Sequence, residues 1–149
     1  MYLKGKQWNG KLYDPENINI YEIKNGKGFI KIYNYWGELK FEGEYLNGER
    51  NGKGNEYNGD GELEFEGEYL NEERNGKGKG KEYDYFNGKL RFEGEYLNGK
   101  RNGKGKEYDY FNGKLRFECE YLYGNIGKGK EYNNDGKLIF EGEFLDEKR

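Results

Sequence analysis

The sequence of 149 residues lacks alanine, valine, serine, threonine and histidine, and it contains only one cysteine and one proline. Without serine, threonine and histidine, the chain cannot build a serine triad, a threonine nucleophile or a Cys–His pair. Zinc and haem sites lose most of their usual ligands for the same reason. These absences predict a protein without metal and without cofactor.

Carboxylates are plentiful, so paired-acid chemistry such as glycoside hydrolysis is the catalytic class that stays open. The glutamate pairs, however, recur in successive repeat units, at Glu42/Glu44, Glu66/Glu68, Glu93/Glu95 and Glu141/Glu143. A catalytic pair occurs once in a protein, whereas a repeated pair is typical of a solvated surface. The sequence therefore predicts that the protein is not an enzyme.

Long apolar runs are also missing. No stretch approaches the ~20 apolar residues that a membrane-spanning helix needs, and the N-terminus has no apolar signal region. A single cysteine, Cys119, excludes an internal disulfide and fits a reducing compartment. These features predict a cytoplasmic protein.

The charges nearly balance, with 26 lysine and arginine residues against 29 aspartate and glutamate residues and a net charge of −3. A nucleic-acid-binding domain needs a basic excess, so nucleic acid is not expected as a partner. The same charge disfavours anionic phospholipid, which stays open as an alternative partner.

What the chain does contain is glycine, which occurs 26 times, and aromatic residues, which make up 18% of it. Charged residues account for a further 37%. High charge with few aliphatic residues is often typical of disorder, but a small net charge and many Tyr and Phe residues favour a folded chain.

One short phrase, Phe-Glu-(Gly/Cys)-Glu-(Tyr/Phe), is written five times. It begins at Phe41, Phe65, Phe92, Phe117 and Phe140, so the spacings are 24, 27, 25 and 23 residues. A period of about 25 residues indicates an array in which each unit buries its apolar face against its neighbours. We expect one repeat array over 1–149, degenerate over 1–40 and regular over 41–149.

The phrase alternates in the manner of a half-buried β-strand. Leu39, Phe41 and Tyr45 fall on one face, and Glu42 and Glu44 fall on the other. Asn-Gly and Asp-Gly dipeptides between these runs supply the positive φ that tight hairpin turns require. The predicted fold is all-β: an elongated, single antiparallel sheet of about twelve strands, built from stacked β-hairpins.

The aromatic face is expected to be the buried one. The small residue between two aromatic residues is interpreted as a slot for a ring from a neighbouring strand, although plain backbone freedom would also explain glycine there. Cys119 occupies the same slot and is predicted to be a small buried side chain. The expected structural residues are Phe41, Gly43, Tyr45, Phe65, Gly67, Tyr69, Phe92, Gly94, Tyr96, Phe117, Cys119, Tyr121, Phe140, Gly142 and Phe144, with the leucines at 39, 63, 90, 115 and 138.

The opposite face is expected to carry the charges. Glu93 and Glu95 are predicted to lie opposite Lys104 and Lys106 across the hairpin, where exposed pairs stabilise by a few tenths of a kcal/mol. These charges solubilise the sheet and set the register of its strands.

The phrase in its context, "GKLRFEGEYLNGKRNGKGKEY" at residues 88–108, resembles the MORN (membrane occupation and recognition nexus) repeat, which runs Tyr-x-Gly-x-aromatic, then Asn-Gly, then Gly-x-Gly. The resemblance covers about residues 29–149. Asn51, Asn75 and Asn102 stand where that family often has His, and Tyr stands for its usual Trp. The resemblance implies a sheet of stacked hairpins used for scaffolding, dimerisation or docking, with membrane association proposed for some members.

The leading functional hypothesis is a non-enzymatic scaffold that binds protein through an aromatic-bearing face or through open sheet edges. The candidate partner-binding residues are Tyr83, Tyr85, Tyr108, Tyr110 and Phe111. The first and last strands come from a similar phase of the repeat, so self-association through the sheet edges is predicted as well. Carbohydrate binding by stacking on exposed Tyr rings is a further alternative.

Overall fold

The computed structural model describes residues 9–13 and 20–144, and within these ranges it contains strands, turns and loops but no helix. The strands are β1 (Gly10–Tyr13), β2 (Ile20–Ile23), β3 (Lys27–Tyr33), β4 (Leu39–Leu46), β5 (Glu49–Tyr57), β6 (Leu63–Leu70), β7 (Glu73–Tyr83), β8 (Leu90–Leu97), β9 (Lys100–Tyr108), β10 (Leu115–Leu122), β11 (Asn125–Tyr132) and β12 (Leu138–Glu143). The predicted all-β class is confirmed. Accordingly, no helix in the described ranges could span a membrane.

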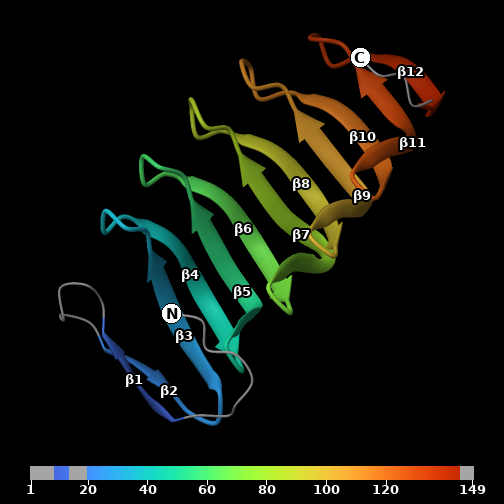
Figure 1. Cartoon of the computed structure of the whole chain (residues 1–149). Coiled ribbons are helices and arrows are strands. Elements are labelled where there is room, and N and C mark those ends of the chain that lie inside the picture. The colour runs from blue at the N-terminus through green and yellow to red at the C-terminus, as the bar shows by residue number, and fades with distance from the viewer. Residues whose placement is uncertain (1–8, 14–19, 145–149) are drawn as a thin grey trace.

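Ten strands, β3 to β12, form one antiparallel sheet in which neighbours in sequence are neighbours in space (Figure 1). Each period of the repeat is thus one hairpin added to the last, as predicted. The prediction of a single sheet of about twelve strands is wrong for the first two strands, because β1 and β2 pair with one another as a separate two-stranded sheet. A single bridge, Lys24 to Lys27, joins β2 to β3 before the two strands diverge.

Two kinds of connection alternate along the sheet. At one end of the strands, two-residue turns use positive φ, as at Asn98 (49°) and Gly99 (80°), which matches the Asn-Gly signal in the sequence. At the other end of the strands lie longer loops, in which an Asn or Asp side chain caps the backbone. For example, Asn58 Oδ1 accepts hydrogen bonds from the backbone N of Asp60 and of Glu62, both at 3.0 Å. We call the loops 34–38, 58–62, 84–89, 109–114 and 133–137 the loop edge; Figure 1 shows them in one row.

A row of glycines crosses the sheet at right angles to the strands. Its members are paired in register, except that Gly67 and Gly80 meet at a register irregularity: Gly43, Gly54, Gly67, Gly80, Gly94, Gly105, Cys119, Gly129 and Gly142. A Cβ on Gly94 would lie 2.7 Å from Cζ of Phe92 and 2.7 Å from Cα of Gly105. The glycines are therefore slots for rings, as predicted. The ring over Gly94 comes from its own strand, two residues earlier, and not from a neighbouring strand.

The second glycine of three hairpins, at Gly54, Gly80 and Gly105, lies under rings from two hairpins. A Cβ on Gly105 would meet Phe92 at 2.7 Å and Tyr121 at 3.0 Å. These two rings meet edge to face, with 5.4 Å between their centroids. Equivalent contacts join Phe41 to Tyr69, at 5.3 Å, and Phe65 to Tyr96, at 5.2 Å. The core is thus a row of aromatic rings packed on glycine backbone, which we call the ring zipper. Each edge-to-face contact in it joins one hairpin to the next.

Burial follows the predicted face and becomes weaker in the last strand. Phe65 and Phe92 are fully buried, and Phe41, Tyr69, Tyr96 and Tyr121 are buried as well. In β12, Leu138 and Phe140 are 49% and 40% exposed, which is still less than the 62% of the interleaved Glu141 side chain. The reason for the weaker burial is that β12 is the outermost described strand of the sheet, so no ring of a following hairpin covers Phe140 in the way that Tyr121 covers Phe92.

Cys119 lies in the glycine row and is buried, as predicted. Its side chain fills the slot that the Phe92 ring overlies in the preceding unit. Phe117, the counterpart of Phe92, is consequently only half-buried, and its ring packs on that of Phe144 at 5.9 Å. Cysteine in the slot therefore displaces the ring rather than accommodating it.

The thiol of Cys119 should be inert in the folded protein. Burial raises its pKa to about 11, so very little thiolate exists near pH 8. We expect a disulfide reagent to label Cys119 only after denaturant unfolds the chain, and Cys119→Gly to change the free energy of unfolding by less than about 1 kcal/mol. Rapid labelling of the native protein would show that the side chain is not in the slot.

A methyl group in the glycine row should destabilise the sheet. Gly94→Ala places its Cβ against the Phe92 ring and the Gly105 backbone, and we expect a loss of about 1–3 kcal/mol in the free energy of unfolding, measured by denaturant titration. Gly59→Ala is the matched control, because no atom lies within 4 Å of a Cβ at that loop position. Equal stability of the two variants would refute the slot.

Candidate interaction surfaces

The outer side of the ring zipper is closed by a hydrogen-bond network that repeats with the hairpins. The carboxylate of Glu56 accepts hydrogen bonds from the Tyr69 hydroxyl, at 2.6 Å, and from Nη2 of Arg74, at 2.5 Å. In the next unit Glu82 accepts from the Tyr96 hydroxyl and from Arg101. Each carboxylate thereby ties a tyrosine of one strand to an arginine of the next strand.

The arginines also lie over the rings beneath them. The guanidinium carbon of Arg74 is 4.0 Å from the centroid of Phe65, and that of Arg101 is 3.9 Å from the centroid of Phe92. Cation–π contacts of this kind are worth about 0.5–2 kcal/mol, more when the site is shielded from water. The arginines therefore cover the core while neutralising the carboxylates beside it.

This network sets the pKa of its carboxylates. Burial by itself would raise the pKa of Glu82, but the hydrogen bonds from Arg101 and Tyr96 outweigh it and hold the pKa below its ordinary value. Burial, and then the neighbouring carboxylate, raise the pKa of Tyr96 well above that of a free tyrosine. The buried tyrosine, glutamate and arginine groups of the aromatic face are thus hydrogen-bonded to one another.

Sequence reasoning missed this network, although the repeat contains a signal for it. The glutamate precedes the last Tyr of its strand, as in Glu82-Tyr83, and in three units an arginine lies five residues after the Tyr of the repeated motif, as in Tyr96 and Arg101. The pattern breaks at Ile126, which takes the arginine position of the fourth unit. Glu107 there accepts from Tyr121 and from Arg101 of the preceding unit.

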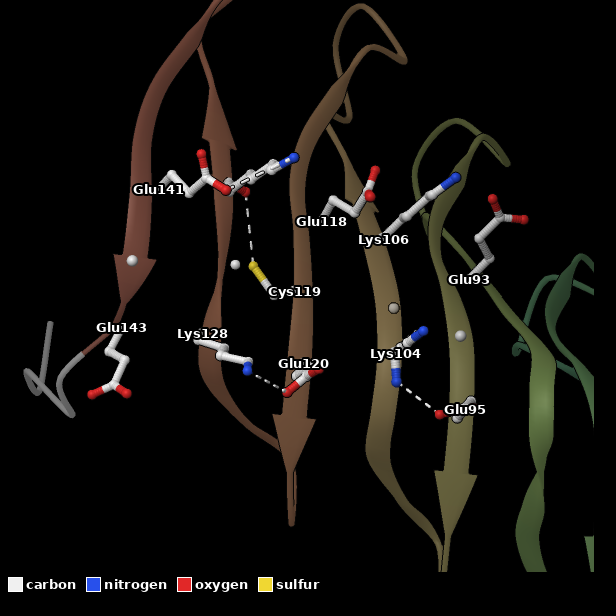
Figure 2. Close-up of a pocket in the computed structure, with 15 residues that line it drawn as sticks. Glu93, Glu95, Lys104, Lys106, Glu118, Cys119, Glu120, Lys128, Glu141 and Glu143 are labelled. Carbon is white, nitrogen blue, oxygen red and sulfur yellow. Dashed lines mark hydrogen bonds and ion pairs between the residues drawn. The ribbon is translucent and has the colours of Figure 1, made fainter.

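On the opposite face a charged groove of about 840 Å³ crosses β8 to β12 (Figure 2). Its floor is the backbone of the glycine row, and its two walls are rows of side chains that alternate in charge from strand to strand. One wall is Glu93, Lys106, Glu118, Lys130 and Glu141; the other is Glu95, Lys104, Glu120, Lys128 and Glu143. Of the predicted pairs across the hairpin, Glu93 is in register with Lys106, and the Glu95 carboxylate accepts a hydrogen bond from the backbone N of Lys104 at 2.8 Å.

The groove walls carry little interaction energy. The Lys128–Glu120 and Lys130–Glu141 pairs are both 3.9 Å long and open to solvent, and such pairs contribute about 0–1 kcal/mol each. Within residues 9–13 and 20–144, no three carboxylate or thiol groups come together so as to hold a metal ion. Because neighbouring strands carry opposite charges, each strand of the groove lies beside side chains of complementary charge.

The five predicted partner-binding residues separate into two groups. Tyr83 and Tyr108 are half-buried at strand ends, where their hydroxyls donate to Glu66 and Glu93, each at 2.6 Å. Burial and these hydrogen bonds raise the pKa of both tyrosines to about 12. The other three lie at the loop edge, where Tyr85, Tyr110 and Phe111 are 51%, 49% and 72% exposed.

The loop edge also exposes aromatic residues that the sequence prediction omitted. Phe86 is 89% exposed and occupies the same place in "DYFNGK" as Phe111, so the repeat itself could have identified it. Tyr35 and Trp36, in the first loop, are 96% and 81% exposed. Aromatic side chains this exposed add nothing to the core that lies beneath the sheet.

Hydrogen bonds tie these loops to one another. The Tyr85 hydroxyl donates to Asp60 at 2.9 Å, Asn87 Nδ2 donates to the carbonyl of Tyr110 at 2.7 Å, and Lys89 Nζ donates to the carbonyl of Phe111 at 2.9 Å. Lys114 Nζ continues the series to the carbonyl of Asn134 at 3.0 Å. The exposed rings therefore stand on a cross-linked base.

A scan of protein-family models and a search of the curated proteins both give no match.

The Tyr–Glu–Arg network makes the free energy of unfolding depend on pH. Because the folded-state pKa of Glu82 is lowered, its contribution is complete above the ordinary pKa of about 4.5 and is lost as the pH falls through the folded-state pKa. We expect Glu82→Gln to lower the free energy of unfolding at pH 7 by about 1–3 kcal/mol and to flatten its fall below pH ~5, measured by urea titration at several pH values. Glu120→Gln, on the open groove wall, should change it by less than about 0.5 kcal/mol, and an unchanged acid dependence in Glu82→Gln would contradict the network.

Proposed function

We propose that the protein is a non-enzymatic repeat scaffold that binds protein partners through the loop edge. The observation that carries this proposal is the pair of exposed aromatic rings on each of the adjacent loops 84–89 and 109–114, which are cross-linked by hydrogen bonds. Aromatic side chains dominate the binding energy of protein interfaces, and a rigid base reduces the entropy lost on binding. Core packing does not account for these aromatic residues, because their rings lie outside the core.

The two faces of the sheet also support binding at the loop edge. The aromatic face is filled by its own rings and arginines, and the groove on the other face alternates in charge. The loop edge presents the most exposed aromatic rings of the described residues, at Tyr35, Trp36, Phe86 and Phe111. The scaffold role also agrees with the MORN-like pattern of the repeats, whose members serve in docking and assembly, and we assign the chain to that type as part of the same proposal.

Self-association is a second candidate, supported by the outer strand of the sheet. Ile139 and Phe140 on β12 are 57% and 40% exposed, and among the described strands β12 pairs with β11 alone. An exposed apolar edge strand is a template for strand addition. A second copy is the partner that this edge would suit, because each copy carries the same unfinished ring zipper.

The loop-edge proposal is tested with a double variant, Phe86→Ser with Phe111→Ser. Both side chains are exposed, so we expect the melting temperature to stay within a few degrees of the parent. Partner proteins captured from the source cell extract by the tagged parent chain should fall by about tenfold or more with the double variant, measured by quantitative mass spectrometry.

The matched control for this experiment is Leu122→Ser with Tyr123→Ser, at the opposite edge of the sheet, where the two side chains are 60% and 65% exposed. This control should keep the partners of the parent chain. If the two double variants capture the same partners in the same amounts, protein binding does not occur at the loop edge.

A further inference from the structure

We infer that the loop edge is built to bind a proline-rich segment in the polyproline II conformation, with prolines three residues apart. This inference rests on the proposed function and names the class of partner at the same surface. The site consists of the aromatic pairs Tyr85/Phe86 and Tyr110/Phe111 on adjacent loops, with the acidic loop 58–62 beside them.

The spacing of the loops favours this conformation over others. Successive loops are separated by two strands, which is about 9.6 Å at the usual strand spacing. A polyproline II helix has three residues per turn and a rise of about 3.1 Å, so every third residue faces the same side at about 9.3 Å. The two repeats differ by about 0.3 Å per step, and a ligand of this kind stays in register over three loops.

Other regular conformations fit less well. An extended strand presents same-side residues about 6.7 Å apart, far from the loop spacing. An α-helix returns to the same face after seven residues, at about 10.5 Å, and accumulates an error of about 1.8 Å over two steps. The loop edge therefore discriminates among backbone conformations before any side chain is considered.

The aromatic pairs supply the apolar contact that proline needs. The rings of Tyr110 and Phe111 lie 3.9 Å apart between centroids and tilted by 36°, and those of Tyr85 and Phe86 meet edge to face at 5.3 Å. Each pair is one compact apolar platform per loop. Proline-rich segments dock on aromatic surfaces of this type because their conformation is already formed and little entropy is lost.

A third contact of the ligand follows from the charges of the neighbouring loop, which favour a basic ligand residue. Loop 58–62 contains Asp60 and Glu62 and neither lysine nor arginine, whereas 84–89, 109–114 and 133–137 each contain one acidic residue and one lysine. Lys89 and Lys114 are hydrogen-bonded to backbone carbonyls of the next loop, so they point away from loop 58–62. Asp60 and Glu62 are both exposed one loop before Tyr85, and a basic residue three positions from the first proline would reach them.

The ligand is thus Arg-x-x-Pro-x-x-Pro or its reverse, because a polyproline II helix reads nearly alike in both directions. The test uses the whole chain and two fluorescent synthetic peptides, one in each order, titrated by anisotropy. Spacing controls keep the composition but place the prolines two or four residues apart, and a charge control replaces Arg by Gln. We expect saturable binding of one order and at least about tenfold weaker binding of both spacing controls.

Variants then locate the binding. The double variant Phe86→Ser with Phe111→Ser should weaken binding by at least about tenfold, whereas Leu122→Ser with Tyr123→Ser should leave it unchanged. Glu62→Gln, which spares the hydrogen bond from Tyr85 to Asp60, should weaken binding of the Arg peptide by about threefold or more and leave binding of the Gln peptide unchanged, and added salt should act in the same way.

The outcomes separate the two levels of the proposal. If neither peptide order binds, or if the spacing controls bind equally well, the polyproline II assignment is overturned, and the scaffold function survives as long as partner capture still depends on Phe86 and Phe111. If capture is insensitive to these residues, the function proposed for the loop edge fails as well. Binding of soluble β-linked oligosaccharides that is lost in the Phe86/Phe111 double variant would overturn the assignment in favour of carbohydrate.

Discussion

The structure depends on aromatic rings that lie on glycine backbone across hairpin boundaries. Phe92 lies over Gly94 and Gly105 and meets Tyr121 of the next hairpin, and this arrangement recurs at Phe41 and Phe65. A ring can approach the sheet this closely only where a side chain is missing. A chain with few aliphatic residues thereby obtains a dense core from a single layer of strands, because the rings supply the apolar area and the glycines supply the room.

The remaining interactions follow from that arrangement. Tyrosines in the zipper must satisfy buried hydroxyls, so Glu56, Glu82 and Glu107 stand beside them, and the carboxylates in turn need Arg74 and Arg101. On the reverse face the glycine row leaves a smooth floor between two charged walls. The loop edge is free of these demands, which is why exposed aromatic residues there, such as Phe86, invite a functional explanation.

Single-layer repeats also localise the effect of each change. Cys119 displaces Phe117 from its slot without disturbing Phe92 one hairpin away, and Ile126 leaves Glu107 with the arginine of the preceding unit. In a compact core the same substitutions would spread through many contacts. Here each hairpin contacts only its neighbours, so the array tolerates imperfect units.

Alternation, glycine spacing and turn dipeptides were enough to predict the all-β array, the buried face, the slots and the place of Cys119, because these depend on periodicity along one strand. Which residues meet across strands could not be read in this way. The Tyr96–Glu82–Arg101 contact, the exposure of Phe140 and the split between half-buried Tyr83 and exposed Tyr85 depend on which hairpin lies beside which and on where each strand bends into a loop. Those relations arise between units, where the three-dimensional stacking decides the partners of each side chain.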